Sequence, residues 1–251
     1  MNDKKENTAE EIKVSSPLSA KLENFWYHYK WHSIAAVVVI AITVVLVLQT
    51  CSRVSYDGYI LYAGPYEIKQ TSQNGDIAPY AEAISSLKKV CSDYDNDGTV
   101  NVTLQNLFVL NDKEANELYE INPGQSINTS LVQEDTKTLG QVMLYGDYYV
   151  CFLSERLFLE YDEKYNGAIF SKVEPYVNAE KEYELCSERG IYLRSLDIYS
   201  LPELCNLPDD TVVCLRSLSE VSSKLNKAEN ERNFAMGEAL FRNIVNYSKQ
   251  H

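Results

Sequence analysis

The sequence predicts an α/β domain that follows one transmembrane helix, the domain being one mixed or mostly parallel sheet with covering helices. Two observations indicate this fold class. An apolar run at 34–48 lies near the N-terminus. After it, short apolar runs alternate with segments in which apolar residues recur at helical spacing, as is typical of strands and helices in a partly parallel sheet. The chain has 251 residues, 45% of them hydrophobic, which is enough for one such domain.

The apolar run predicts a membrane-spanning helix. Residues 31–52 include no Lys, Arg, Asp or Glu, and as a helix they reach about 33 Å, close to a hydrocarbon thickness of about 30 Å. A buried core helix, a cleaved signal peptide and a lipoprotein lipidated at Cys51 are the alternatives to a permanent anchor. Aromatic rings precede the run, where such rings lie among lipid headgroups: Trp26, Tyr27, Tyr29 and Trp31.

The charges around the span predict its orientation. Five lysines precede it, whereas only Arg53 and Lys69 follow within about 20 residues, and the flank richer in cations stays in the cytoplasm. We therefore expect residues 1–30 to form a cytoplasmic tail and juxtamembrane segment. Residues 31–52 are then the transmembrane helix, and residues 53–251 are an extracellular α/β domain, with the cell membrane as a partner.

The first half of the domain contains two predicted strands with a helix between them. Residues 59–63 form a continuous apolar run, and residues 99–109 begin with alternating apolar and polar side chains, so both are expected to be strands. Residues 78–91 place four apolar side chains on one helical face: Ala83, Ile84, Leu87 and Val90.

The second half repeats the alternation. A helix is expected at 131–145, ending before Gly146, and the apolar run at 148–153 is typical of a strand buried on both faces. The remaining elements follow from the same patterns: a short helix at 155–161, weak strands at 168–173 and 190–193, a strand at 211–215 and a final helix at 227–247.

The composition excludes several functions. Residues 57–251 contain 17 Lys and Arg against 31 Asp and Glu, a net charge of −14, so we expect no nucleic-acid partner. No glycine-rich nucleotide fingerprint occurs, so we expect no nucleotide either. The histidines are His28, His32 and His251, which leaves the body of the domain without a histidine for a nucleophilic triad or a zinc site.

Cysteine usage does not indicate a disulfide framework. Five cysteines lie in the domain, and an odd number cannot pair completely within it. Cys151 and Cys214 lie in strand-like runs and are expected to be buried thiols. Cys186 and Cys205 have more polar neighbours, so the sequence leaves open whether these two form a bridge.

One segment, DYDNDGTVN, has the pattern of a calcium-binding loop. Carboxylates stand at loop places 1, 3 and 5, which are Asp93, Asp95 and Asp97, and a glycine stands at place 6. The carbonyl of Thr99 and the side chain of Asn101 complete the expected metal ligands. Three carboxylates beyond the negative end of a helix dipole repel one another unless a cation lies among them.

The pattern departs from an EF-hand at place 12, where Leu104 stands instead of the bidentate glutamate. The missing acid must come from elsewhere in the chain, or the affinity is low. The segment resembles the single calcium loops of some exported binding proteins, and that resemblance implies a structural Ca²⁺. An Asp-rich turn that ends at Gly98 is the alternative.

Four segments carry a wider resemblance: KLENFWYHYKWHSI at 21–34, DYDNDGTVNV at 93–102, GDYYVCFLS at 146–154 and EALFRNIVNY at 238–247. Together they resemble a group of uncharacterised single-pass surface proteins of clostridial-type Gram-positive bacteria. The resemblance implies an extracellular domain similar to one lobe of an extracellular solute-binding protein. It implies no particular activity.

These observations predict a membrane-anchored extracellular module, braced by calcium, that binds a ligand or a protein partner. The 17 tyrosines of residues 53–251 can line a ligand cleft, but strands also favour tyrosine. A structural or signalling subunit of a membrane complex is an alternative. Another is a carboxylate-based hydrolase that acts on a cell-wall or polysaccharide substrate and needs two facing acids. The candidates are Glu160, Asp162, Glu163, Glu182 and Glu184.

Overall fold

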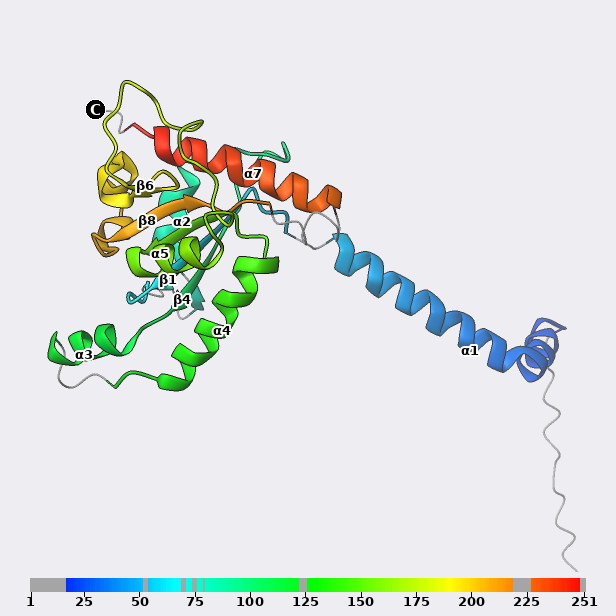
Figure 1. The fold of residues 1–251 in the computed structure, drawn as a ribbon. Coiled ribbons are helices and arrows are strands. Elements are labelled where there is room, and N and C mark those ends of the chain that lie inside the picture. The colour runs from blue at the N-terminus through cyan, green and yellow to red at the C-terminus, as the bar shows by residue number, and fades with distance from the viewer. Residues whose placement is uncertain are drawn as a thin grey trace, which may run out of the picture. The chain divides into compact units, whose positions relative to one another are not determined.

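The computed structural model describes residues 17–51, 54–68, 71–73, 76–78, 80–121, 126–218 and 227–248. The chain forms two compact units, Met1–Val54 and Ser55–His251 (Figure 1). Of the expected cytoplasmic tail, residues 1–16 lie outside the described part of the chain.

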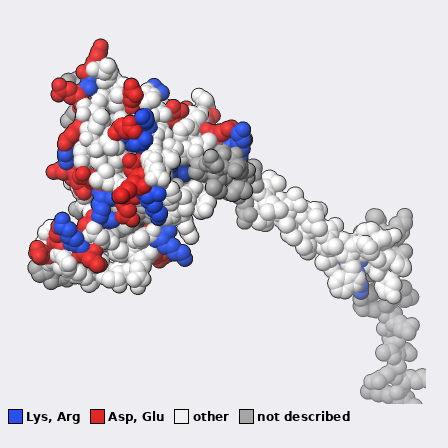
Figure 2. Space-filling model, viewed as in Figure 1, with Lys and Arg blue, Asp and Glu red and all other residues white. Residues whose placement is uncertain are grey.

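The first unit contains one long helix, α1, at Pro17–Cys51. Its stretch Phe25–Leu48 has a mean hydropathy of 2.6 and is not buried among the described residues. Apolar side chains lie around its whole circumference. In Figure 2 the helix is largely white, whereas the second unit carries many red and blue side chains. A helix this long that is apolar on all sides has the length and composition to cross a membrane.

The second unit is built on a six-stranded sheet in the order β4-β1-β5-β8-β7-β6. β1 pairs in parallel with β4 and β5, and the remaining pairs are antiparallel. The expected α/β class with a mixed sheet is therefore confirmed. The strands are β1 (Gly58–Gly64), β4 (Val102–Phe108), β5 (Val150–Ser154), β6 (Leu185–Ser187), β7 (Gly190–Tyr192) and β8 (Thr211–Leu215), and β2 (Thr71–Gln73) and β3 (Asp76–Ala78) form a separate antiparallel pair.

Helices cover both faces of the sheet. The chain leaves β1 for β4 on one side and then returns past β1 to β5 on the other, so right-handed crossovers place the connecting helices on opposite faces. One core lies under α2 and α7 and the other under α4 and α5. The helices are α2 (Ala81–Lys88), α3 (Asp112–Ile121), α4 (Thr129–Tyr145), α5 (Glu155–Lys164) and α7 (Lys227–Asn246), with short 3₁₀ turns at Leu193–Ser195, Asp197–Ser200 and Leu204–Asn206.

The structure differs from the local predictions in three places. The helix expected from residue 78 begins at Ala81, because Tyr80 has a φ of 58°, which right-handed helical residues do not adopt. The strand expected at 168–173 is a single bridge between Phe170 and Arg216. A third difference is that α3 and β6 are not predicted at all; both are short and neither buries a row of apolar side chains.

Arg216 is fully buried just after β8, beside the C-terminal end of α4. Its guanidinium donates hydrogen bonds to the carbonyls of Tyr148 at 3.1 Å and Met143 at 3.4 Å, and to that of Gly146. The guanidinium carbon lies 4.4 Å from the ring centre of Tyr149. Because the last carbonyls of a helix carry partial negative charge, they favour a cation at this place.

Candidate metal centre

The loop at 92–101 connects α2 to β4 and holds the predicted calcium ligands. Two of its residues have left-handed backbone conformations, Asn96 with a φ of 59° and Gly98 with a φ of 87°. Glycine and asparagine tolerate this region best, so the sequence suits the turn. Where α2 ends, the side-chain amide of Asn243 in α7 donates to the carbonyl of Val90 at 3.0 Å, which fixes the start of the loop.

Asp57 holds the loop from the opposite side. It directly precedes β1 and is 3% exposed. Its Oδ1 accepts the backbone N–H groups of Tyr94 at 2.7 Å and Asp95 at 3.4 Å, and its Oδ2 accepts that of Asn101 at 2.8 Å. A buried carboxylate is tolerated where N–H groups satisfy it. Asp57 therefore anchors both ends of the loop to the start of β1.

The carboxylates of the loop also accept N–H groups from the loop itself. Asp93 accepts those of Asp97 at 3.2 Å and Gly98 at 2.9 Å, and Asp95 accepts that of Asp97 at 3.1 Å. Asp97 turns toward Thr99, whose N–H and hydroxyl donate to it at 2.7 and 2.6 Å. These bonds compensate part of the negative charge and give the loop a defined shape.

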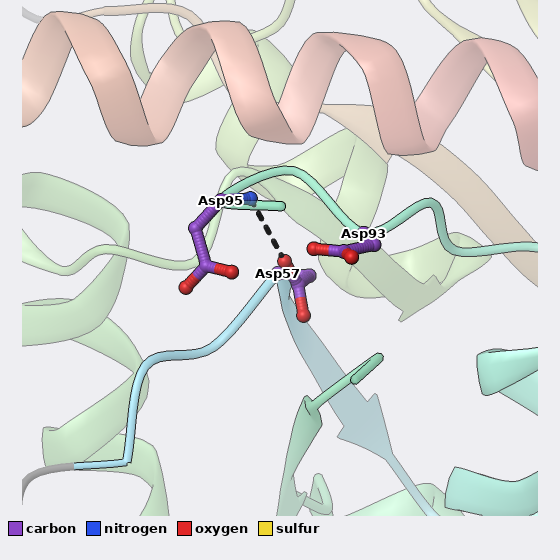
Figure 3. Close-up of side chains that lie close together, drawn as sticks. All are labelled: Asp57, Asp93 and Asp95. Carbon is purple, nitrogen blue, oxygen red and sulfur yellow. Dashed lines mark hydrogen bonds between the residues drawn. The ribbon is translucent and has the colours of Figure 1, made fainter. Parts of the chain in front are cut away.

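Three carboxylates converge from two distant parts of the chain. One oxygen from each of Asp57, Asp93 and Asp95 lies within 4.8 Å of the other two. Figure 3 shows Asp57 at the start of β1 facing the loop, with the hydrogen bond from the N–H of Asp95. Asp57 is buried and the other two are partly exposed. Oxygens grouped in this way can hold a metal ion.

Asp95 has a pKa below its ordinary value. The first cause is a hydrogen bond from the hydroxyl of Ser55, and the backbone of Asp97 and the charge of Arg232 on α7 act in the same direction against partial desolvation. The carboxylate is therefore ionised down to lower pH than a free aspartate. Protons compete less with a cation for this group.

The donor set is chemically selective. It consists of carboxylate oxygens, which suit hard cations such as Ca²⁺ or Mg²⁺. The nearby Cys91 donates its thiol to the carbonyl of Asp57 at 3.4 Å. Burial, with a smaller effect of Asp57, raises the pKa of this thiol to about 12. The thiol therefore stays protonated at neutral pH while no metal is bound.

The structure brings two of the three predicted carboxylate ligands into the cluster: Asp93 and Asp95 belong to it, and Asp97 does not. The cluster is defined by carboxylates, so it does not test the other two predicted ligands, the carbonyl of Thr99 and the side chain of Asn101. Asp97, Thr99 and Asn101 are linked to one another by hydrogen bonds in the loop. Their role as metal ligands stays a prediction.

Sequence reasoning missed Asp57, the residue that faces the loop from β1. The pattern leaves an acid missing at place 12, where Leu104 stands, and Asp57 is a carboxylate from elsewhere in the chain. The one local signal is an acid directly before an apolar strand. That signal becomes useful only with the knowledge that β1 and β4 are parallel neighbours, with Gly58 opposite Val102.

Other residues singled out from the sequence lie away from this cluster. Cys186 and Cys205 are both free thiols, and Cys151 and Cys214 are buried. Three of the acids considered for a hydrolase lie within ion-pair distance of an arginine, as is common on a solvated surface: Glu160 with Arg156, Asp162 with Arg189 and Glu184 with Arg194.

The chain matches no protein-family model, no curated protein and no solved structure. Its class therefore follows from the structure itself. It is an α/β domain preceded by one candidate membrane-spanning helix, with an acidic cluster that can hold a metal ion. The similarity to a lobe of a solute-binding protein stays an expectation.

Proposed function

We propose that the protein is a membrane-anchored binding module. In this proposal α1 spans the cell membrane, the N-terminus lies in the cytoplasm and the α/β domain lies outside. The long apolar helix supports the span, and the excess of lysines before it supports the orientation. A calcium ion held by Asp57, Asp93 and Asp95 braces the loop at 92–101.

The observation that carries the metal site is the approach of three carboxylate oxygens to within 4.8 Å of one another. At this separation the charges repel, and the N–H groups around them offset that repulsion only in part. A divalent cation removes the remaining conflict. Because Asp57 directly precedes β1 and the other two belong to the loop, the ion would fix the loop against the sheet.

The orientation predicts labelling of Cys205 on intact cells. Cys205 is an exposed free thiol, whereas burial raises the pKa of Cys91 and of Cys186, so these two react slowly with maleimides. In a chain carrying Cys51→Ser, a membrane-impermeant maleimide should modify the protein without lysis. The further substitution Cys205→Ser should remove most of that labelling, as measured by mass spectrometry.

The matched control places a thiol before the span. In the same chain without Cys51 and Cys205, the substitution Ser15→Cys should give a thiol that reacts only after the cells are permeabilised. Reaction at residue 15 on intact cells, with Cys205 protected in the parent chain, would show the opposite orientation.

Calcium is expected to raise the melting temperature of the domain. With a Kd of about 10⁻⁴ M, typical of extracellular calcium modules, about 10 mM calcium adds roughly 2.7 kcal/mol to the free energy of unfolding. For a domain of this size that is a shift of about 5–10 °C. Calorimetry of the full chain in detergent, in calcium and in chelator, measures the shift, which Asp93→Asn/Asp95→Asn should abolish.

Two further variants sharpen the assignment. Asp112→Asn removes an exposed carboxylate at the start of α3 and should keep the full calcium shift. Asp97→Asn should also keep it if the cluster alone binds the ion, and should lose it if the predicted ligand at place 5 takes part. A wild-type chain whose melting temperature is the same in calcium and in chelator would refute the metal centre.

A further inference from the structure

A groove lies beside the candidate metal centre, between the start of β1 and the first half of α7. Its volume is about 430 Å³, inside the range of about 300–1,000 Å³ that is typical of small-molecule sites. It adjoins the metal centre, because Ser55, which lines it, is the first cause of the lowered pKa of Asp95. Aromatic and polar side chains line it: Ser55, Tyr56, Tyr59, Asp147, Arg232 and Asn233.

Tyrosine rings form one wall of the groove. The rings of Tyr56 and Tyr59 have centres 5.7 Å apart and planes at 62°, and those of Tyr59 and Tyr148 have centres 5.9 Å apart and planes at 87°. Edge-to-face contacts of this kind hold each ring in place. Burial, and then the charge of Asp147, raises the pKa of Tyr59, so its hydroxyl stays neutral. The wall offers a ligand an apolar surface with polar tips.

Charges of both signs lie along the groove. Arg232 is exposed, and in the described part of the chain no hydrogen bond or ion pair engages its guanidinium. Asp147 is exposed as well, and its Oδ1 accepts the amide of Asn233 at 3.1 Å. Glu229 lines the same groove. The two carboxylates of Asp147 and Glu229 would repel a simple anion. A ligand with one cationic and one anionic group complements the charges of both signs.

We propose that this groove binds a small zwitterion, a free amino acid or a short peptide, with the carboxylate on Arg232 and the ammonium group at Asp147. A guanidinium pairs with a carboxylate through two parallel hydrogen bonds, and the side chain of the ligand lies against Tyr56 and Tyr59. The inference rests on the proposed binding function. Calcium at the neighbouring centre strengthens binding, because it neutralises Asp95, which otherwise competes for the charge of Arg232.

Saturation-transfer NMR of the full chain in nanodiscs tests the groove, with L-phenylalanine and phenylalanylglycine as probes. At least one probe should bind and receive saturation at its ring protons. Tighter binding of phenylalanine would indicate a free amino acid as the ligand, and tighter binding of phenylalanylglycine a short peptide. Arg232→Gln should weaken binding about tenfold or more, since it removes a charge-assisted pair. Arg242→Gln, at an exposed position on the same helix, is the matched control and should leave binding unchanged.

Modified probes separate the two ends of the ligand. Phenylalanine amide lacks the carboxylate and N-acetylphenylalanine lacks the ammonium group, so each should bind about tenfold more weakly than phenylalanine. Asp147→Asn should weaken the binding of phenylalanine and leave that of N-acetylphenylalanine unchanged. Equal binding by wild type and Arg232→Gln, or no binding of either unmodified probe at about 10 mM, the weak limit of useful affinity, overturns the proposal.

The same titrations in calcium and in chelator separate this inference from the metal centre. The groove residues do not need the ion, so phenylalanine should bind in both conditions and more tightly in calcium. A chain that binds phenylalanine through Arg232 but shows no calcium shift in its melting temperature overturns the metal centre alone. A chain that shows the calcium shift and binds no probe overturns the groove alone.

Discussion

Replacing Arg216 by methionine is expected to lower the free energy of unfolding by about 3–5 kcal/mol. The substitution removes the hydrogen bonds to the carbonyls of Met143, Gly146 and Tyr148. Met143 and Gly146 lose this donor at the end of α4, whereas the carbonyl of Tyr148 keeps the weak contact from the thiol of Cys151 at 3.8 Å. It also removes the contact of the guanidinium with the ring of Tyr149. Urea unfolding of the full chain in detergent, followed by circular dichroism, measures the loss.

Two variants define what the guanidinium contributes. Arg216→Lys keeps the positive charge but not the planar group that reaches several carbonyls at once, so roughly half of the loss is expected. Arg242→Met changes an exposed arginine and should cost less than about 1 kcal/mol. A loss of under about 1 kcal/mol in Arg216→Met would mean that the end of α4 is stable without this side chain.

Asp57→Asn is expected to lower the free energy of unfolding by about 3 kcal/mol even in chelator. Two oxygens of Asp57 accept three backbone N–H groups of the loop. An asparagine keeps one oxygen and turns an NH₂ group toward donors, so at least one N–H loses its acceptor. Chemical unfolding in chelator, with Asp95→Asn as the comparison, measures this role without any metal.

The comparison separates an anchor of the loop from a metal ligand. Asp95 is only partly buried, so Asp95→Asn should cost under about 1 kcal/mol in chelator. In calcium, both variants should lose the stabilisation that the ion gives the wild type. If Asp57→Asn were as stable as wild type in chelator and weaker only in calcium, Asp57 would be a ligand and not the anchor of the loop.

The sequence predicts those elements that bury a regular row of apolar side chains. β1 and β8 are continuous apolar runs and are buried along nearly their whole length, so their positions follow from composition alone. α3 is short and has no buried residue, so the helical spacing of Ala115, Leu118 and Tyr119 is a weak signal that the prediction does not use. The antiparallel pairing of β5, β8, β7 and β6 cannot be predicted from the sequence pattern either, because strand direction depends on the lengths and paths of the connections.

Only those residues of the candidate site that lie close together in the sequence can be predicted. Asp93 and Asp95 belong to a spacing that is recognisable within nine residues. Asp57 lies 37 residues before Tyr94, whose N–H it accepts, and the pairing of β1 with β4 is what brings them together. The groove cannot be predicted from local sequence either. Tyr59 and Arg232 both line it because α7 packs on the sheet face at the start of β1.

The strand at which the chain joins the α/β unit has a mechanical consequence. β1 follows Asp57 directly and lies between two parallel neighbours, β4 and β5. A pulling force that arrives along the chain from its N-terminal side acts along the axis of β1, so the hydrogen bonds on both of its flanks carry the load together in shear. A strand at the margin of the sheet would instead peel away one bond at a time. In the proposed anchored state, such a force would load the hydrogen bonds on both flanks of β1 together.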